Sequence, residues 1–85
     1  MSEPHQTRLK RLRMRSSRRG TKEMDLILGA FAERWLDTMN EDRLRQYDAL
    51  LQENDQDLYA WVTGQAPAPA RFADLIGEIA KTRHD

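Results

Sequence analysis

The stretch RRGTKEMD, residues 18–25, separates a basic N-terminal arm from a body whose apolar residues follow helical spacing. Gly20 in its middle can adopt a positive φ, so one helix can end there and the next can leave at a sharp angle. Glu23 lies three residues further on, where a carboxylate can accept hydrogen bonds from the free amides of a helix's first turn. Asp25 adds a second negative charge to that turn. The stretch therefore predicts a joint between two helices, with Glu23 as a capping carboxylate.

The segment after this joint, residues 21–39, has the strongest helical periodicity in the chain. Its apolar residues recur at steps of three and four, and others widen the stripe toward a second face. Because the apolar arc is so wide, we expect this helix to be central, with Gly29 permitting close approach of a neighbour. The first stripe consists of Met24, Ile27, Leu28, Phe31, Trp35 and Met39, and the second face of Leu26, Ala30 and Leu36.

Four further segments have helical patterns, at residues 6–17, 41–52, 56–63 and 70–82. We expect Asn40 to cap the second of these, Asn54 or Asp55 to cap the third, and Gly64 to end the third. The first has a thin apolar stripe and must lean on the rest of the protein.

No segment shows the alternating pattern of a strand, so the predicted fold is all-α, a compact bundle of five short helices without a sheet. One domain over residues 6–83 is expected to follow a disordered N-terminus at residues 1–5. The aromatic residues Trp35, Tyr59 and Trp61 are expected in the core rather than around a cofactor.

Composition limits the chemistry that this chain can perform. Its 85 residues make one small domain without cysteine, which excludes disulfides and a thiol nucleophile. His5 and His84 lie near opposite ends, and no glycine-rich phosphate motif follows a strand. Asp55 and Asp57 open a helix and are interpreted as capping charges rather than metal ligands. We therefore expect no catalytic residue, no metal site and no stably held cofactor, and no apolar run is long enough to span a membrane.

Charge is distributed unevenly along the chain. Residues 1–20 hold seven Lys or Arg against one acidic residue, whereas the rest holds seven basic and thirteen acidic residues. The arm therefore faces an anionic partner or docks on the protein's own acidic body. An Arg-rich start is also typical of mitochondrial transit peptides, but from the short leader and the lack of an export signal we expect a bacterial cytoplasm.

Several motifs around the joint resemble one family. Arg19-Gly20-x-x-Glu23, followed by Met24-Asp25 and later by Asp55-x-Asp57-Leu58-Tyr59-x-Trp61, resembles the SdhE family of FAD assembly factors of succinate dehydrogenase. The resemblance runs from about residue 8 to residue 64. It implies a small helical chaperone, not an enzyme, that binds the flavoprotein subunit of succinate dehydrogenase, or of fumarate reductase. It further implies that FAD becomes attached covalently to a histidine of that client, and that the factor holds no FAD itself.

The candidate docking surface lies on both sides of Gly20. A bare backbone between guanidinium groups and carboxylates suits close, hydrogen-bonded docking on another polypeptide. Its proposed partner-binding residues are Arg15, Arg18, Arg19, Gly20, Glu23 and Asp25. We expect Arg19 and Glu23 to point outward, where the resemblance implies contact with the flavoprotein, and we expect a monomer when the chain is free.

Two alternatives of other classes remain at this point. An arginine-rich helix followed by a turn and a second helix is a common footprint for phosphate contact, which favours a small nucleic-acid-binding protein. Against it, the body is net acidic, and the helix after the turn is too apolar to read base edges. An antitoxin-like partner of another protein is the second alternative.

Overall fold

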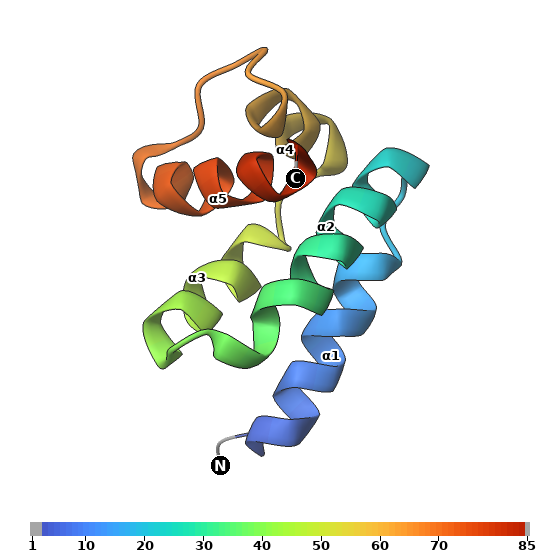
Figure 1. Cartoon of the computed structure of the whole chain (residues 1–85), viewed down its shortest axis with the longest axis vertical. Helices are drawn as coiled ribbons and strands as arrows, with labels where there is room; N and C mark the ends of the chain where they lie inside the picture. The colour runs from blue at the N-terminus through green and yellow to red at the C-terminus, as the bar shows by residue number, and fades with distance from the viewer. Residues whose placement is uncertain (1–2, 85) are drawn as a thin grey trace.

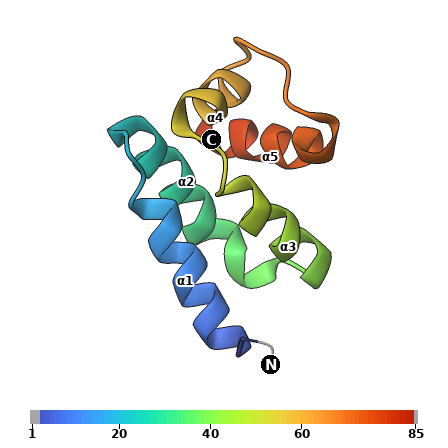
Figure 2. The same cartoon turned by 180° about the vertical axis from the view of Figure 1, so that it is seen from behind.

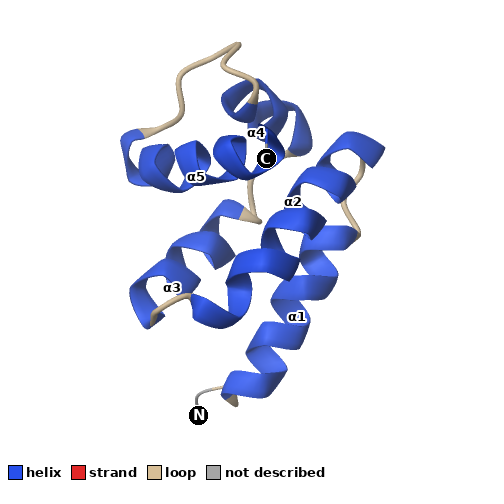
Figure 3. Cartoon of the chain, viewed as in Figure 1, coloured by secondary structure: helices blue, strands red, loops and turns tan. Residues whose placement is uncertain are grey.

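Five α-helices and two short 3-10 turns make up the computed structural model, which describes residues 3–84 (Figure 1 and Figure 3). Within these residues there is no strand, so the predicted all-α fold of five helices is confirmed. The elements are α1 (His5–Ser17), α2 (Lys22–Trp35), η1 (Leu36–Thr38), α3 (Glu41–Leu50), α4 (Asp55–Val62), η2 (Ala70–Phe72) and α5 (Ala73–His84).

Helix α2 is the central element, as its wide apolar arc predicts. It runs alongside α1 in both views, and it also contacts α4 and α5 (Figure 1 and Figure 2). The rings of Phe31 on α2 and Tyr47 on α3 lie 5.7 Å apart, which joins α3 to the same core. Fully buried side chains come from every helix and include Leu12, Met24, Leu28, Phe31, Leu44, Tyr47, Leu58 and Leu75.

The ends of two helices, α3 and α4, are capped by residues that the sequence predicted. The side chains of Asn40 and Asn54 accept hydrogen bonds from the amides of Arg43 and Asp57, at 2.8 and 2.9 Å. Of the two candidates for α4, Asn54 is therefore the cap and Asp55 is not. Gly64 ends the α4 region with φ 80°, the left-handed conformation that a glycine adopts without a steric penalty.

Several predicted boundaries and placements are wrong. The predicted helix over residues 21–39 stops at Trp35 and tightens into η1, because Asn40 must be extended to cap α3. Trp35 is 40% exposed and donates from Nε1 to Thr82 Oγ1, and Leu26 is 64% exposed, so neither belongs to the core. Tyr59 and Trp61 pack against the core, as expected.

The N-terminal helix begins at His5, one residue earlier than predicted. Its start overlaps the segment for which disorder was expected, residues 1–5. Met1 and Ser2 from that segment lie outside the described residues.

Candidate functional site

Arg19, which the sequence predicts at the surface, points into the protein. Its side chain is 10% exposed, and its Nε donates to Asp55 Oδ1 at 2.8 Å. Its two terminal nitrogens donate to the backbone oxygens of Leu51 and Glu53, each at 2.8 Å. These carbonyls follow α3, where a helix leaves acceptors unpaired and favours a cation. Arg19 therefore ties the α1–α2 turn to the α3–α4 turn, and the expectation of an outward-pointing Arg19 is wrong.

Two carboxylates fix the backbone of the same turn. Asp55 Oδ2 accepts from the amide of Gly20 at 2.6 Å and from that of Thr21 at 3.2 Å. Asp25 accepts from the amide of Arg19 through Oδ1. Three successive amides of the turn are thus bound by the chain's own acidic side chains, so Asp25 acts inside the turn rather than as an outward-facing charge.

Asp55 is the residue of this site that the sequence analysis missed. It was grouped with Asp57 as a helix-capping charge, but Asn54 already fills that role. The carboxylate of Asp55 is 12% exposed and turns toward residues 34 to 36 positions earlier in the chain. The sequence offered one signal: both Asn54 and Asp55 could cap α4. Because a helix needs one such cap, one of the two side chains was available for a contact elsewhere.

Gly20 is favoured at the joint because the Asp55 carboxylate lies close to its backbone, and not because its φ is positive. Gly64 is the one described residue with positive φ, so the predicted left-handed glycine at the joint is wrong. A Cβ atom on Gly20 would lie 3.3 Å from Asp55 Oδ2, which is tighter than most Cβ contacts in proteins. Any side chain at this position therefore presses on the carboxylate that holds the turn.

Glu23 remains outside, as predicted. Its side chain is exposed and forms no hydrogen bond or ion pair among residues 3–84. It is not the helix cap, because Thr21 Oγ1 accepts from the amide of Met24 at 3.3 Å and fills that position. Glu23 borders a surface hollow of about 250 Å³, which is lined by Thr21, Glu23, Asp55, Gln56 and Tyr59. We call Gly20, Glu23 and this hollow the docking corner.

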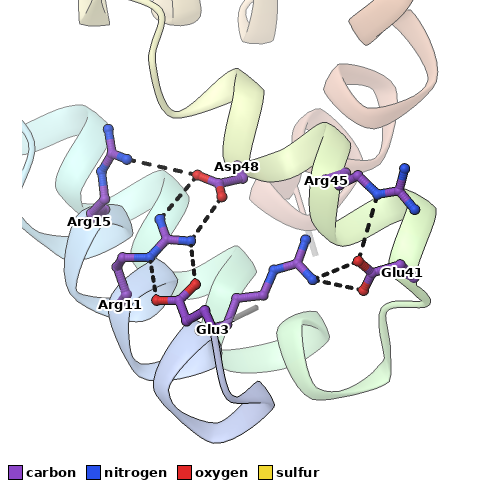
Figure 4. Close-up of polar contacts among 7 residues, drawn as sticks. Glu3, Arg11, Arg15, Glu41, Arg45 and Asp48 are labelled. Atoms are coloured by element: carbon purple, nitrogen blue, oxygen red, sulfur yellow. Dashed lines mark hydrogen bonds and ion pairs between the residues drawn. The ribbon is translucent and has the colours of Figure 1, made fainter. Parts of the chain in front are cut away.

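The two remaining candidates lie beside the docking corner. Arg18 is exposed and has no hydrogen bond or ion pair within the described part of the chain. Arg15 points toward α3, with Nη1 3.8 Å from Asp48 Oδ1 (Figure 4). The structure thus keeps Arg18, Gly20 and Glu23 exposed, while it engages the other three candidates in its own packing.

The basic arm docks on the protein's own acidic body, which decides between the two interpretations of its charge. Arg11 pairs with Glu3 and Asp48, both at 2.9 Å, and Arg8 pairs with Glu41 at 2.7 Å. Figure 4 shows these carboxylates between α1 and α3. The hydrogen bond from Arg11 lowers the pKa of Asp48, and that from Arg8 lowers the pKa of Glu41. These arginines are therefore committed to holding α1 in place.

A buried pair of hydroxyl groups lies beneath the ion pairs. Ser16 Oγ donates to the backbone oxygen of Leu12 at 2.7 Å and lies 2.5 Å from the hydroxyl of Tyr47. Because Ser16 uses its proton toward Leu12, Tyr47 donates to Ser16. Burial raises the pKa of Tyr47 to about 12, so the hydroxyl stays protonated at neutral pH.

Neither a cluster of metal ligands nor a membrane-spanning helix is present among the described residues. No three His, Asp or Glu side chains within residues 3–84 are grouped as a metal ion would require. None of the helices in that range has the length and apolar character needed to cross a bilayer.

Comparison with known families decides the affiliation of the chain. Residues 10–83 match the model of a family described as the flavinator of succinate dehydrogenase. The chain belongs to this flavinator family. The match includes the whole docking corner and the Arg19–Asp55 pair, and it extends past Gly64, where the resemblance seen in the sequence weakens.

Relatives of this chain are named succinate dehydrogenase assembly factor 2, mitochondrial. That of Mycosarcoma maydis is 37% identical over 83 residues, covering 98% of this chain and 35% of that protein. The relative from Danio rerio is 40% identical over 80 residues, which cover 87% of this chain and 51% of that protein. The relative from Saccharomyces cerevisiae is 41% identical over 76 residues, which cover 86% of this chain and 47% of that protein. This chain thus spans about a third to a half of the length of these relatives.

The names of these relatives correct one expectation. A bacterial cytoplasm was predicted, but the relatives that this chain matches are eukaryotic proteins named as mitochondrial. The prediction of a bacterial cytoplasm is therefore contradicted. Affiliation with succinate dehydrogenase assembly, in contrast, agrees with the resemblance drawn from the motifs.

Proposed function

We propose that this chain is an assembly factor that binds the flavoprotein subunit of succinate dehydrogenase and promotes covalent attachment of FAD to it. The observation that carries the proposal is the family match over residues 10–83, which includes an exposed Gly20 and Glu23 on a fixed turn. A flavoprotein subunit of fumarate reductase is a second client of the same kind.

Docking is proposed to act through orientation. The backbone at Gly20 and the free carboxylate of Glu23 form a rigid polar corner, because Arg19 and Asp55 hold the turn from inside. A client bound there would keep its histidine and the isoalloxazine ring of FAD aligned for bond formation, which raises the rate without a catalytic group from the factor. On this proposal the chain is a chaperone and not an enzyme.

Arg19 has a supporting role in this mechanism. Three of the five N–H donors of a guanidinium are used here for bonds within the chain. Because the side chain is also 10% exposed, a direct action on charge developing in the flavin would require Arg19 to leave this position. We therefore assign Arg19 to holding the docking corner, and Glu23 to contact with the client.

FAD is proposed to be bound by the client and not by this chain. The hollow of the docking corner has a volume of about 250 Å³, and the unpaired charge at its edge is the carboxylate of Glu23. A negative group is an unfavourable neighbour for the diphosphate of FAD. The chain is further proposed to be a monomer before it meets the flavoprotein.

Nucleic-acid binding is disfavoured by the ion pairs of the arm. Arg8, Arg11 and Arg13 are paired with carboxylates of the same chain, at 2.7, 2.9 and 2.5 Å. Contact with phosphates would have to replace these pairs, so little free energy would be gained.

The test compares Glu23→Gln with Glu33→Gln, since Glu33 is also exposed on α2 but lies near the other end of that helix. Each variant is added to apo-flavoprotein and FAD, and covalent flavin is measured by fluorescence in a denaturing gel. We expect Glu23→Gln to reduce covalent flavin and co-purification of the client, and Glu33→Gln to retain both. Equal yields from both variants and the parent chain would remove the docking corner from the mechanism.

A further inference from the structure

Asp55 lies on α4, yet its carboxylate binds the α1–α2 turn on the other side of the docking corner. It accepts from Arg19 Nε and from the amides of Gly20 and Thr21 at 2.8, 2.6 and 3.2 Å. We propose that Asp55 is the positioning residue of the docking corner, setting the backbone that the flavoprotein contacts. This inference rests on the proposed function, because it concerns the same surface.

The turn has little else to hold it in shape at Gly20. Gly20 is exposed, and Asp55 Oδ2 is the single described atom, apart from those of neighbouring residues, within 4 Å of where its Cβ would be. The path of the backbone is therefore set by hydrogen bonds and not by packing. When the carboxylate is lost, Gly20 and Thr21 lose their shared acceptor and can turn away.

The position of Asp55 also fixes that of Glu23. Thr21 receives the Asp55 hydrogen bond at its amide and caps α2 with its hydroxyl. Because Glu23 lies in the first turn of α2, the start of that helix and the Asp55 carboxylate are joined through one residue. Asp55 thus acts through the turn and need not touch the client.

The exchange Asp55→Asn tests the inference with little change in shape. The amide of Asn retains one acceptor oxygen, but it places an NH₂ group where the second carboxylate oxygen now meets two amides or the guanidinium. Asp57→Asn is the matched control, since Asp57 lies in the same first turn of α4, is exposed, and bonds Asn54 instead of the turn. Both exchanges remove one negative charge from the same helix end.

Affinity for apo-flavoprotein is measured by biolayer interferometry at a temperature where circular dichroism shows each variant folded. We expect Asp55→Asn to weaken binding about tenfold or more, in line with loss of charge-assisted hydrogen bonds, and Asp57→Asn to bind as the parent chain does. Ile79→Val, which opens a small cavity in the core on α5 and does not touch the residues that line the docking corner, serves as a destabilised variant. It is expected to keep its affinity, which separates positioning from stability alone.

A second variant keeps the inference testable if Asp55→Asn does not fold. Asp55→Glu keeps the charge but moves the carboxylate by one methylene group, and we expect weakened binding with the fold retained. Amide hydrogen exchange of Gly20 and Thr21 should accelerate in either variant. Parent-like affinity in a folded Asp55 variant, or a loss equal to that of Ile79→Val, would overturn the inference.

Glu23→Gln is measured beside these variants to keep two failures apart. If Glu23→Gln loses affinity and Asp55→Asn does not, the positioning role is wrong and the proposed docking surface stands. If Glu23→Gln and Asp55→Asn both bind as the parent chain does, the docking corner is not the contact, and the inference falls together with that part of the proposed function.

Discussion

Arg19 and Asp55 form an ion pair between two turns that lie far apart in the sequence, with 2.8 Å between Nε and Oδ1. Their side chains are 10% and 12% exposed. The pair therefore makes the α1–α2 turn and the start of α4 into one rigid unit. In the motif Arg19-Gly20-x-x-Glu23, the arginine supports the surface from inside and the glutamate lies on it.

Replacing Arg19 by Ala should destabilise the fold strongly. The exchange leaves Asp55 without its charged partner and the oxygens of Leu51 and Glu53 without donors. Removing one partner of a buried ion pair costs about 3 kcal/mol or more of unfolding free energy. Urea unfolding followed by circular dichroism measures the unfolding free energy. For Arg18→Ala, at an exposed position, we expect a value within about 0.5 kcal/mol of that of the parent chain. Equal effects at the two positions would contradict the role assigned to Arg19.

The inward turn of Arg19 was not predictable from the sequence, because it depends on where α4 lies relative to the joint. Helix periodicity and caps are local signals, and they predicted the five helices and the cap Asn40, and narrowed the cap of α4 to Asn54 or Asp55. A contact such as Gly20 to Asp55 spans 35 positions and has no periodic signature. Short-range reasoning therefore assigned Asp55 to the nearest amides, those of its own helix.

Acid should weaken the fold through the carboxylates between α1 and α3. The bond from Arg11 lowers the pKa of Asp48 below its usual 3.8, so the folded state favours the charged form. A lowered pKa contributes stability above the unfolded value, and this contribution is lost as the pH falls below about 3.8 toward the folded pKa. We expect the unfolding free energy to fall in that range and to fall less in Asp48→Asn. An unchanged pH profile in Asp48→Asn would argue against this ion pair as a source of stability.

Alkali should weaken the fold through Tyr47. Its pKa rises from 10.0 to about 12 on folding, so between these values the folded state holds a proton that the unfolded chain has released. Stability is complete below pH 10 and declines as the pH rises toward 12, by at most about 1.4 kcal/mol per pH unit. Tyr47→Phe should lack this decline when urea unfolding is compared at pH 9 and pH 11. An equally steep decline in Tyr47→Phe would place its source elsewhere.

Exchange of glycine for alanine should raise the stability of the protein at one position and lower it at another. Gly77 lies inside α5 with nothing within 4 Å of an added Cβ, so Gly77→Ala should stabilise the protein by roughly 1 kcal/mol through helix propensity. Gly64 has φ 80°, where a Cβ is strained, so Gly64→Ala should cost about 1 kcal/mol. Thermal unfolding measures both changes. Melting temperatures that shift in the same direction in the two variants would contradict the backbone conformations assigned to Gly64 and Gly77.

The apolar pattern of α2 predicted its central place but overestimated its buried arc. Leu26 and Trp35 continue the helical stripe, yet Leu26 is exposed on the outer face of α2, and Trp35 at its last position remains partly exposed although it bonds Thr82 of α5. The charge pattern likewise left two interpretations of the arm. Only the position of α3 beside α1, with Asp48 and Glu41 facing the arginines, decided between them.

Site-directed photo-cross-linking tests the central claim most directly, since it reports which face of the chain meets the flavoprotein. A photoreactive amino acid is placed at Gln56, which borders the docking corner, or at Lys10 on the exposed side of α1, and the chain is irradiated with apo-flavoprotein. The account predicts a cross-linked flavoprotein from position 56 and little from position 10. Efficient cross-linking from position 10 with none from position 56 would contradict it.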